Sequence, residues 1–295
     1  MTDNLRPKNA IIAAYLLPSF VIYIVIFIVP AVMAVALSFL KFSSIRNFDF
    51  VGLANYRFLM RDANVWLALK NNLFLIAVCL VGQIGIAFFL AVLLSSPKIM
   101  CANLWRTLIY FPVTLSAIVI GYVWQMVYDY NYGIITKLLN IINRSDLVAP
   151  WLAQDKTVML CICIPLIWQY IGFHLVIILS AMTSIDPEVY QMAEIDGAGG
   201  FKRAIHITLP LIKNTLFVCV LLCISANMKA FDHIVAMTNG GPGYSSNVLA
   251  LYAYNTSFQQ MNMGYGSTVA VFILVVTLIL FFSFQKVSEF FRDKD

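Results

Sequence analysis

The sequence from residue 184 to residue 210 reads SIDPEVYQMAEIDGAGGFKRAIHITLP, and this stretch decides the interpretation of the whole chain. Asp186 is a good helix N-cap, Pro187 suits the first helical position, and Glu188 favours the positive end of the helix dipole. The pattern therefore predicts a short helix that begins here. The helix should end at Gly197, where a residue without a Cβ atom can turn sharply.

A second helical piece should follow this corner. Gly199 and Gly200 allow the chain to reverse, and Phe201 begins a segment that leads through Leu209 and Pro210 toward an apolar run. A short helix in a glycine-bounded corner has an outward face that a groove in another protein can accept. The capping residues alone also fit an ordinary surface connection between two membrane spans.

Long uncharged runs dominate the chain outside this stretch. Hydrophobic residues make up 61% of the sequence and charged residues only 11%, against about 25% charged residues in ordinary soluble domains. About 20 apolar residues suffice to cross the hydrocarbon core of a bilayer. The sequence therefore predicts six membrane-spanning helices, over residues 11–40, 72–94, 107–128, 158–182, 211–231 and 267–284.

The first run has an alternative interpretation as a signal peptide. Arg6 and Lys8 precede it, and residues 34–36 resemble a cleavage site. A signal peptide has an apolar core of about 7–15 residues, and this run is much longer. We therefore expect a retained span.

Six spans bring both termini to one side of the membrane, together with connections 95–106 and 183–210. The two sides carry nearly equal numbers of lysines and arginines. These residues are denser in the shorter segments on the side of the termini, which weakly favours termini in the cytoplasm. The expected organisation is an N-terminal span with the loop that follows it, a membrane core that contains the loop 183–210, and a short tail. Their bounds are residues 1–70, 71–285 and 286–295.

Cysteine usage and charge limit the possible partners. Most of the cysteines lie in apolar runs and behave as small hydrophobic residues, so no metal site and no disulfide framework is expected. The net charge of +5 is spread over the loops instead of forming a basic stripe with aromatic residues. This distribution fits anionic lipid headgroups and does not predict nucleic-acid binding.

The stretch 184–210 resembles the cytoplasmic loop of binding-protein-dependent ABC importer permeases. The family pattern is Glu-Ala-Ala, three residues, Gly, nine residues, Ile, one residue, Leu-Pro. The chain departs from it at Gln191, where Glu is usual, and at Met192, where Ala is usual. In the family this acid helps to bind the ATPase subunit, and Gln191 can still form hydrogen bonds. The resemblance assigns the ATPase contact to Tyr190, Gln191, Met192, Ala193, Asp196, Gly197, Ile207, Leu209 and Pro210.

Weaker similarities along the chain resemble the carbohydrate-uptake branch of this family, of the maltose and multiple-sugar permease type. Residues 50–56 look like its first external loop, residues 165–168 like its fourth span, and residues 238–242 like its last external region. The resemblance implies an all-α membrane protein with six transmembrane helices, a type I ABC importer permease bundle, which takes up a sugar or oligosaccharide.

The same resemblance implies partners and a location. The partners are a second homologous permease, two ATP-binding-cassette ATPase subunits and an extracellular or periplasmic solute-binding protein. ATP and Mg²⁺ are bound by the ATPase, and this chain itself holds no cofactor. The location is a bacterial cell membrane, with both termini in the cytoplasm.

The resemblance to the maltose permeases also places Trp168 and Asn227 on positions that contact sugar. An indole offers a flat apolar face to a pyranose ring, and an amide both donates to and accepts from hydroxyls. Phe173 falls on another contacting position. Tyr170 and His174 are candidates from their proximity on the same helix, although His174 can equally be an interior histidine with satisfied hydrogen bonds.

No catalytic motif accompanies these residues. The sequence has no phosphate loop, no His-Glu-x-x-His and no Gly-x-Ser-x-Gly, so we expect a transport subunit that is not an enzyme. One alternative is an ABC permease for another small solute, such as a phosphorylated polyol. A second is an ion-driven secondary transporter, which needs acids inside its spans, and the predicted spans contain none. A third, an intramembrane enzyme, lacks its catalytic residues.

Overall fold

The computed structural model describes residues 9–44, 47–96 and 99–292. Contacts divide the chain into two compact units, each of which is described by itself. Unit 1 consists of Met1–Asp62 and Ala253–Phe272, and unit 2 of Ala63–Tyr252 and Ile273–Asp295. The predicted bounds 1–70, 71–285 and 286–295 follow membrane topology instead of contacts, and they stay a prediction.

The prediction of an all-α membrane protein is confirmed. Within the described ranges, four helices are long and apolar enough to cross a membrane, and two bent helix pairs pass the same test together. The helices total six if each bent pair is one span. The four are Ile12–Ser38, Ala63–Leu94, Val158–Thr183 and Met263–Lys286, and the pairs are Ala102–Thr114 with Ala117–Val127, and Gly200–Leu211 with Lys213–Met228.

The predicted third span, residues 107–128, is not one straight helix. The chain bends by 98° between its two halves. Pro112 lies in a short 3₁₀ turn, and Leu115 and Ser116 then adopt extended conformations, with ψ of 148° and 134°. Proline removes a backbone donor and disfavours a continuous helix, whereas hydropathy alone does not register such a local break.

Unit 1 begins with one long helix and continues into a small hairpin that the sequence did not predict. The helix is continuous through a π-helical turn, and the proline at position 18 lies inside it. The hairpin strands are antiparallel, with Leu40 opposite Phe50 and Lys41 opposite Asp49. The helices and strands are α1 (Asn9–Tyr23), η2 (Ile24–Ile28), α2 (Val29–Ser38), β1 (Leu40–Ser44), β2 (Asn47–Phe50) and α3 (Ala54–Arg61).

Asn55 explains why the first helix can end beside this hairpin. Its side-chain Nδ2 donates to the carbonyls of Ser38, at 2.9 Å, and Leu40, at 3.0 Å. The last carbonyls of a helix have no partner within the helix, so side-chain donors stabilise its end. Ser38 itself is fully buried, and its hydroxyl lies 2.7 Å from the Tyr56 hydroxyl.

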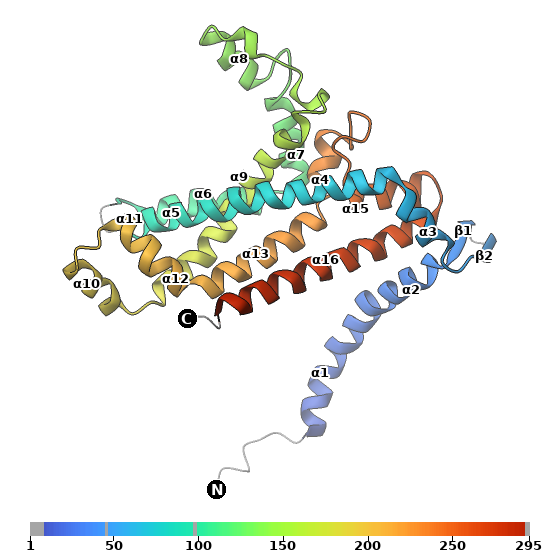
Figure 1. Ribbon diagram of the computed structural model, residues 1–295, viewed down its shortest axis with the longest axis horizontal. Helices are drawn as coiled ribbons and strands as arrows, with labels where there is room; N and C mark the ends of the chain where they lie inside the picture. The colour runs from blue at the N-terminus through green and yellow to red at the C-terminus, as the bar shows by residue number, and fades with distance from the viewer. Residues whose placement is uncertain (1–8, 45–46, 97–98, 293–295) are drawn as a thin grey trace. The chain divides into compact units, whose positions relative to one another are not determined.

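Unit 2 is organised around α9 (Val158–Thr183). A second long helix, Ala63–Leu94, consists of α4 (Ala63–Cys79), η3 (Leu80–Gly85) and α5 (Ile86–Leu94). In the most apolar 18-residue window of α9, 56% of the residues are buried, against 28% in the corresponding window of Ala63–Leu94. α9 packs against α4, α5 and η3 (Figure 1). It is therefore the central helix of this unit.

The remaining elements complete the chain. Figure 1 shows α10 at the left of unit 2 and α8 projecting at its top. The bounds are α6 (Ala102–Tyr110), η4 (Phe111–Thr114), α7 (Ala117–Val127), α8 (Ile134–Ile141), η5 (Ser145–Leu147), η6 (Trp151–Ala153), α10 (Pro187–Ile195), α11 (Gly200–Arg203), η7 (Ala204–Thr208), α12 (Leu209–Leu211), α13 (Lys213–Met228), α14 (Asp232–Met237), α15 (Leu249–Tyr254), η8 (Asn255–Gln259) and α16 (Met263–Arg292).

Two neighbouring asparagines on α4 hold the loop that precedes α15. Asn71 Nδ2 donates to the main-chain carbonyls of Ser245, at 3.1 Å, and Asn247, at 2.8 Å. Asn72 Oδ1 accepts from the main-chain amide of Leu249 at 2.9 Å. Every one of these bonds reaches a main-chain atom of the loop or of the first residue of α15. Both asparagines are buried, so the bonds are shielded from water.

A close approach of α9 to α6 depends on Gly172. A Cβ atom on Gly172 would overlap the Ile109 carbonyl oxygen and lie 2.6 Å from Tyr110 Cα. Backbone cannot move aside as the end of a flexible side chain can, and overpacking costs about 1–3 kcal/mol. Gly172→Ala should therefore lower the thermal stability of the purified protein. Gly85→Ala is the matched control, because a Cβ on Gly85 meets nothing within 4 Å. Equal melting temperatures for the two variants would contradict this account.

Candidate functional site

The predicted short helix is present, and its N-terminal cap is the predicted one. α10 begins at Pro187, and the side chain of Asp186 accepts a hydrogen bond from the backbone N–H of Glu188 at 2.9 Å. This bond satisfies one of the donors that a helix N-terminus leaves without a partner.

The helix also ends where the sequence predicts. Gly197 has a φ of +72°, in the left-handed region that glycine adopts without steric cost. Its N–H donates to Glu194 O at 3.1 Å, and the N–H of Ala198 donates to Ala193 O at 2.9 Å. These two bonds define a Schellman motif, which requires a left-handed residue at the position of Gly197.

The predicted second helical piece follows, one residue earlier than expected. It runs from Gly200 to Leu211 through α11, the π-helical turn η7 and α12. The chain then bends by 76° into α13. Thus the loop 183–210 forms a corner between two membrane helices, α9 and α13.

The corner exposes several large apolar side chains. Met192 is 58% exposed, Ile195 85% and Phe201 72%. Ala193 is buried on the inner side, and the ring of Tyr190 is half-buried below the Arg203 guanidinium, 5.2 Å from the ring centre. Of the other predicted contact residues, Ile207 is half-buried, and the exposed ones are Gln191, Asp196, Gly197, Leu209 and Pro210.

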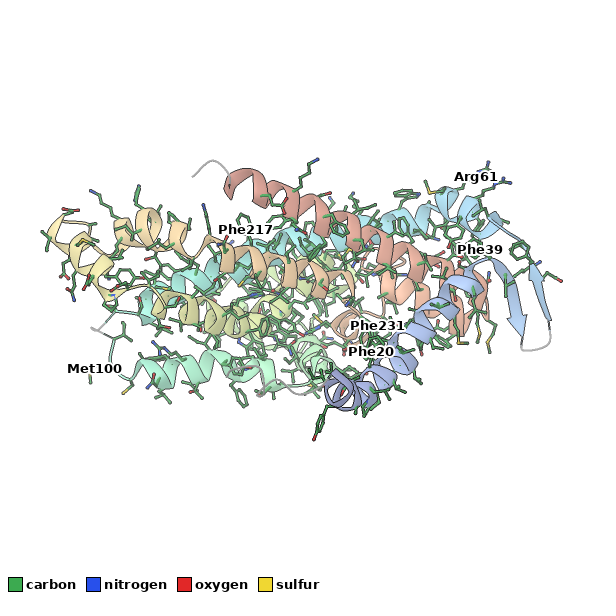
Figure 2. The ribbon with its side chains drawn as sticks, turned by 90° about the horizontal axis from the view of Figure 1, so that it is seen from below. Phe20, Phe39, Arg61, Met100, Phe217 and Phe231 are labelled. Atoms are coloured by element: carbon green, nitrogen blue, oxygen red, sulfur yellow. The ribbon has the colours of Figure 1, made fainter. Side chains whose placement is uncertain are left out.

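Two of the predicted pathway residues meet at a second place. Tyr170 on α9 and Asn227 on α13 line one cavity of about 110 Å³, which we name the pathway cavity. It lies where α13 ends, close to Phe231, which Figure 2 labels. Its polar lining consists of Gln83, Tyr170, Asn227, Lys229, Asp232 and His233.

Asn227 belongs to a buried polar network that joins three helices. Its Nδ2 donates to Cys223 O on its own helix at 2.9 Å, while its main-chain carbonyl accepts from Asn72 Nδ2 at 2.9 Å. Gln83 Nε2 donates across to Leu166 O on α9 at 3.1 Å. Gln83 thus forms a hydrogen bond from its own helix to α9.

The structure does not bring the other three pathway candidates into this cavity. Trp168 is 42% exposed and packs edge-on against Trp124, with ring centres 6.1 Å apart. Phe173 is half-buried, and its ring centre lies 5.3 Å from that of His174. His174 is buried, and its Nδ1 has no hydrogen-bond partner among the described residues. The expectation of a satisfied interior histidine is therefore wrong for this atom.

The sequence missed a buried pair beside the pathway cavity. His233 Nε2 lies 2.7 Å from Gln169 Oε1, and because an amide oxygen only accepts, His233 is the donor. Gln169 Nε2 in turn donates to Leu115 O at 3.0 Å, at the bend between α6 and α7. Gln169 thereby connects α9 with both the bend and α14.

Removing this connection should destabilise the protein. Gln169→Leu leaves the His233 donor and the Leu115 carbonyl unsatisfied, and each buried unsatisfied group costs about 1–3 kcal/mol. We expect a lower melting temperature in a thermal unfolding assay. Gln125→Leu is the control, because Gln125 is exposed and its loss should leave the melting temperature unchanged. A stable Gln169→Leu protein would show that the bonds are not needed.

His233 was missed because residues from 232 onward were assigned to an external connection. The structure instead ends α13 at Met228, and α14 turns back into unit 2 with His233 and Ile234 buried. Lys229 and Asp232, which flank the break, are exposed and line the pathway cavity with opposite charges. The only signal in the sequence was the change from apolar to charged residues at this point.

Comparison with known proteins gives consistent matches over the chain. A family model described as "Binding-protein-dependent transport system inner membrane component" matches residues 83–292. A "Probable ABC transporter permease protein" of Pyrococcus horikoshii is 34% identical, over 88% of this chain and 92% of that protein. The "Multiple sugar-binding transport system permease protein MsmF" of Streptococcus mutans is 27% identical, over 94% of this chain and 95% of that protein.

A solved structure matches the fold along nearly the whole chain. It is a crystal structure of a bacterial ABC transporter involved in the import of the acidic polysaccharide alginate. The TM-score is 0.82, with 20% identity, over 96% of this chain and 96% of the solved chain. At this identity the match concerns the fold alone.

Proposed function

The chain belongs to the family of binding-protein-dependent transport system inner membrane components and has the type I ABC importer permease fold, and from this premise we propose that it imports a sugar or oligosaccharide. The chain is a multi-pass membrane transport subunit. As a subunit without an ATPase site of its own, it takes its energy from a partner that binds ATP and Mg²⁺.

The exposed corner 183–210 carries the proposal. Met192 and Ile195 present more than half-exposed apolar side chains on α10, a helix that is fixed by a cap at one end and a Schellman turn at the other. Phe201 is exposed on α11, just beyond this turn. A rigid short helix with an apolar outward face fits a groove in another protein. We assign this groove to the ATPase subunit, whose closure moves α10 and thereby the spans α9 and α13.

The nature of the pathway cavity supports a polyhydroxylated substrate. Its lining offers amide, phenol, imidazole, ammonium and carboxylate groups, which both donate to and accept from sugar hydroxyls. We propose that Asn227, Tyr170, Lys229 and Asp232 contact the substrate. Trp168, Phe173 and His174 are proposed contacts only where a second permease completes the pathway. The name of the Streptococcus mutans relative supports this substrate class.

The remaining partners and the orientation follow from the same proposal. A second homologous permease completes the bundle, and a solute-binding protein delivers the sugar to the external loops. The end of unit 2 that carries α10 faces the cytoplasm, as do both termini, in a bacterial cell membrane. Lipid covers the apolar side chains on the outside of the spans.

Reconstitution into proteoliposomes tests the proposal. The chain alone should neither hydrolyse ATP nor take up labelled oligosaccharide. Addition of the second permease, the ATPase and the binding protein should produce uptake that depends on ATP. Uptake by the chain alone would refute the importer assignment. ATP-dependent uptake of a phosphorylated polyol in place of a sugar would retain the importer and correct the substrate.

A further inference from the structure

A second, larger cavity lies inside the corner that the loop 183–210 makes with the spans. Its volume is about 300 Å³, at the lower end of the range of about 300–1,000 Å³ that is typical of small-molecule sites. The ends of α5 and α9 form part of its wall, and α10, α11 and η7 form the rest. We name it the corner cavity.

The polar lining of the corner cavity consists of one cation and hydroxyl groups. Arg203 supplies a guanidinium, and the hydroxyls belong to Ser95, Ser96, Tyr190 and Thr208. No described residue of its lining carries a carboxylate. Hydroxyls and a guanidinium are donors that suit the oxygens of a phosphate, and the planar fork of arginine matches two of these oxygens at once.

One of these donors is buried without a protein acceptor, and another has no acidic partner among the described residues. Tyr190 Oη is buried and has no hydrogen-bond partner in the part of the chain that the structure describes. Arg203 packs over the Tyr190 ring. It forms no ion pair among the described residues, where the ion pair seen joins Arg144 and Asp146. A buried donor without an acceptor is unfavourable, because the group has lost its water and gained no partner. A ligand that brings acceptor oxygens removes this cost.

We propose that the corner cavity binds a phosphate group, carried either by a soluble phosphomonoester or by a lipid headgroup. Arg203 donates to the phosphate oxygens, and the hydroxyls of Tyr190 and Thr208 complete the site. Thr208 is 2% exposed, so its hydroxyl is shielded from bulk water. The volume also leaves room for a small group attached to the phosphate.

A ligand in this cavity would contact both the loop and the spans. Tyr190 lies on α10, whereas Val92 and Met182 lie on the spans α5 and α9. A molecule that contacts all three elements fixes α10 relative to the two spans. Occupation of the site would therefore favour one position of the corner over others.

Binding can be measured on the full-length chain in a neutral detergent. The soluble probes are inorganic phosphate and glycerol 3-phosphate, with sodium chloride at matched ionic strength as the blank, read by thermal shift. The lipid probe is phosphatidylglycerol against phosphatidylcholine, read by native mass spectrometry. We expect Arg203→Gln to weaken phosphate binding at least about tenfold. Tyr190→Phe should weaken it about threefold or more while keeping the ring below Arg203.

Lys202→Gln is the matched control, because Lys202 is exposed beside Arg203 and does not line the cavity. It should bind like the parent. Binding of glycerol 3-phosphate identifies a soluble ligand, and retention of phosphatidylglycerol alone identifies a lipid. The proposal is overturned if no probe binds, or if Lys202→Gln and Arg203→Gln lose binding equally. The assay needs no transport, so its failure leaves the proposed import function untouched.

Discussion

Gly197→Val should lower the substrate-stimulated ATP hydrolysis of the partner ATPase at least about tenfold, because α10 no longer couples the ATPase to the spans. The φ of +72° at Gly197 is one that β-branched residues rarely adopt, and the left-handed conformation costs about 1–2 kcal/mol for a residue with a Cβ atom. The variant relieves this strain by opening the Schellman turn, which displaces α10. The spans are unchanged, so the protein should still insert into the membrane.

The matched control for this variant is two residues away. A Cβ on Gly197 or on Gly199 meets nothing within 4 Å, but Gly199 has a φ of −71°. Gly199→Val should therefore keep coupling, and the comparison isolates backbone conformation from steric overlap. The measurements are co-purification of the ATPase and its stimulated hydrolysis. If Gly197→Val equals Gly199→Val in both, the turn does not position α10 for coupling.

Gln191→Glu restores the acid that the family pattern has at this position, so any effect expected is a gain and not a loss of ATPase contact. Gln191 is exposed, so a carboxylate there is solvated and should not destabilise α10. We expect ATPase co-purification to be unchanged or stronger. A weaker association would show that the groove of this ATPase no longer accepts the acid.

Asn227→Ala should reduce sugar uptake by about tenfold or more without loss of assembly. The side chain lines the pathway cavity, and its own donor bonds reach only Cys223 on the same helix. The bond from Asn72 goes to the main-chain carbonyl of Asn227 and survives the substitution. An alanine at this position therefore removes an amide from the cavity while the contact between α4 and α13 stays in place.

Uptake and basal ATP hydrolysis of the complete transporter measure this effect. Asn140→Ala, an exposed asparagine on α8, is the control and should transport like the parent. Trp168→Ala is a second test, because Trp168 lies outside the cavity and contributes only if its exposed indole faces a second permease. Normal uptake by both Asn227→Ala and Trp168→Ala would place the sugar site on the partner permease.

The sequence predicts the elements that depend on local chemistry. The cap at Asp186 and the turn at Gly197 were predicted correctly, because capping and left-handed turns need particular residues at particular positions. The uncharged runs likewise predicted the spans. The family pattern then identified the loop 183–210, and the roles assigned to its contact residues stay a prediction.

The elements that the sequence missed depend on tertiary packing. The bend at Leu115 follows a proline inside an apolar run, and its carbonyl finds a donor only because Gln169 lies opposite on α9. The return of α14 into the core depends on contact with α7, where Gly121 leaves space for Ala236. Periodicity cannot predict either contact, since both join residues distant in sequence. Trp168 was likewise grouped with Asn227 by family position, although Trp168 on α9 lies outside the cavity that Asn227 on α13 lines.

The anchoring of the loop before α15 has a consequence for divergence among importers. Asn71 and Asn72 hold residues 245–249 only through main-chain atoms, so the bonds place no demand on the side chains of that segment. The side chains of residues 246–249 are buried, so packing still limits the substitutions that the anchored segment itself tolerates. Exposed neighbours such as Tyr244 can instead change in small, individually tolerated steps while the backbone beside them keeps its place.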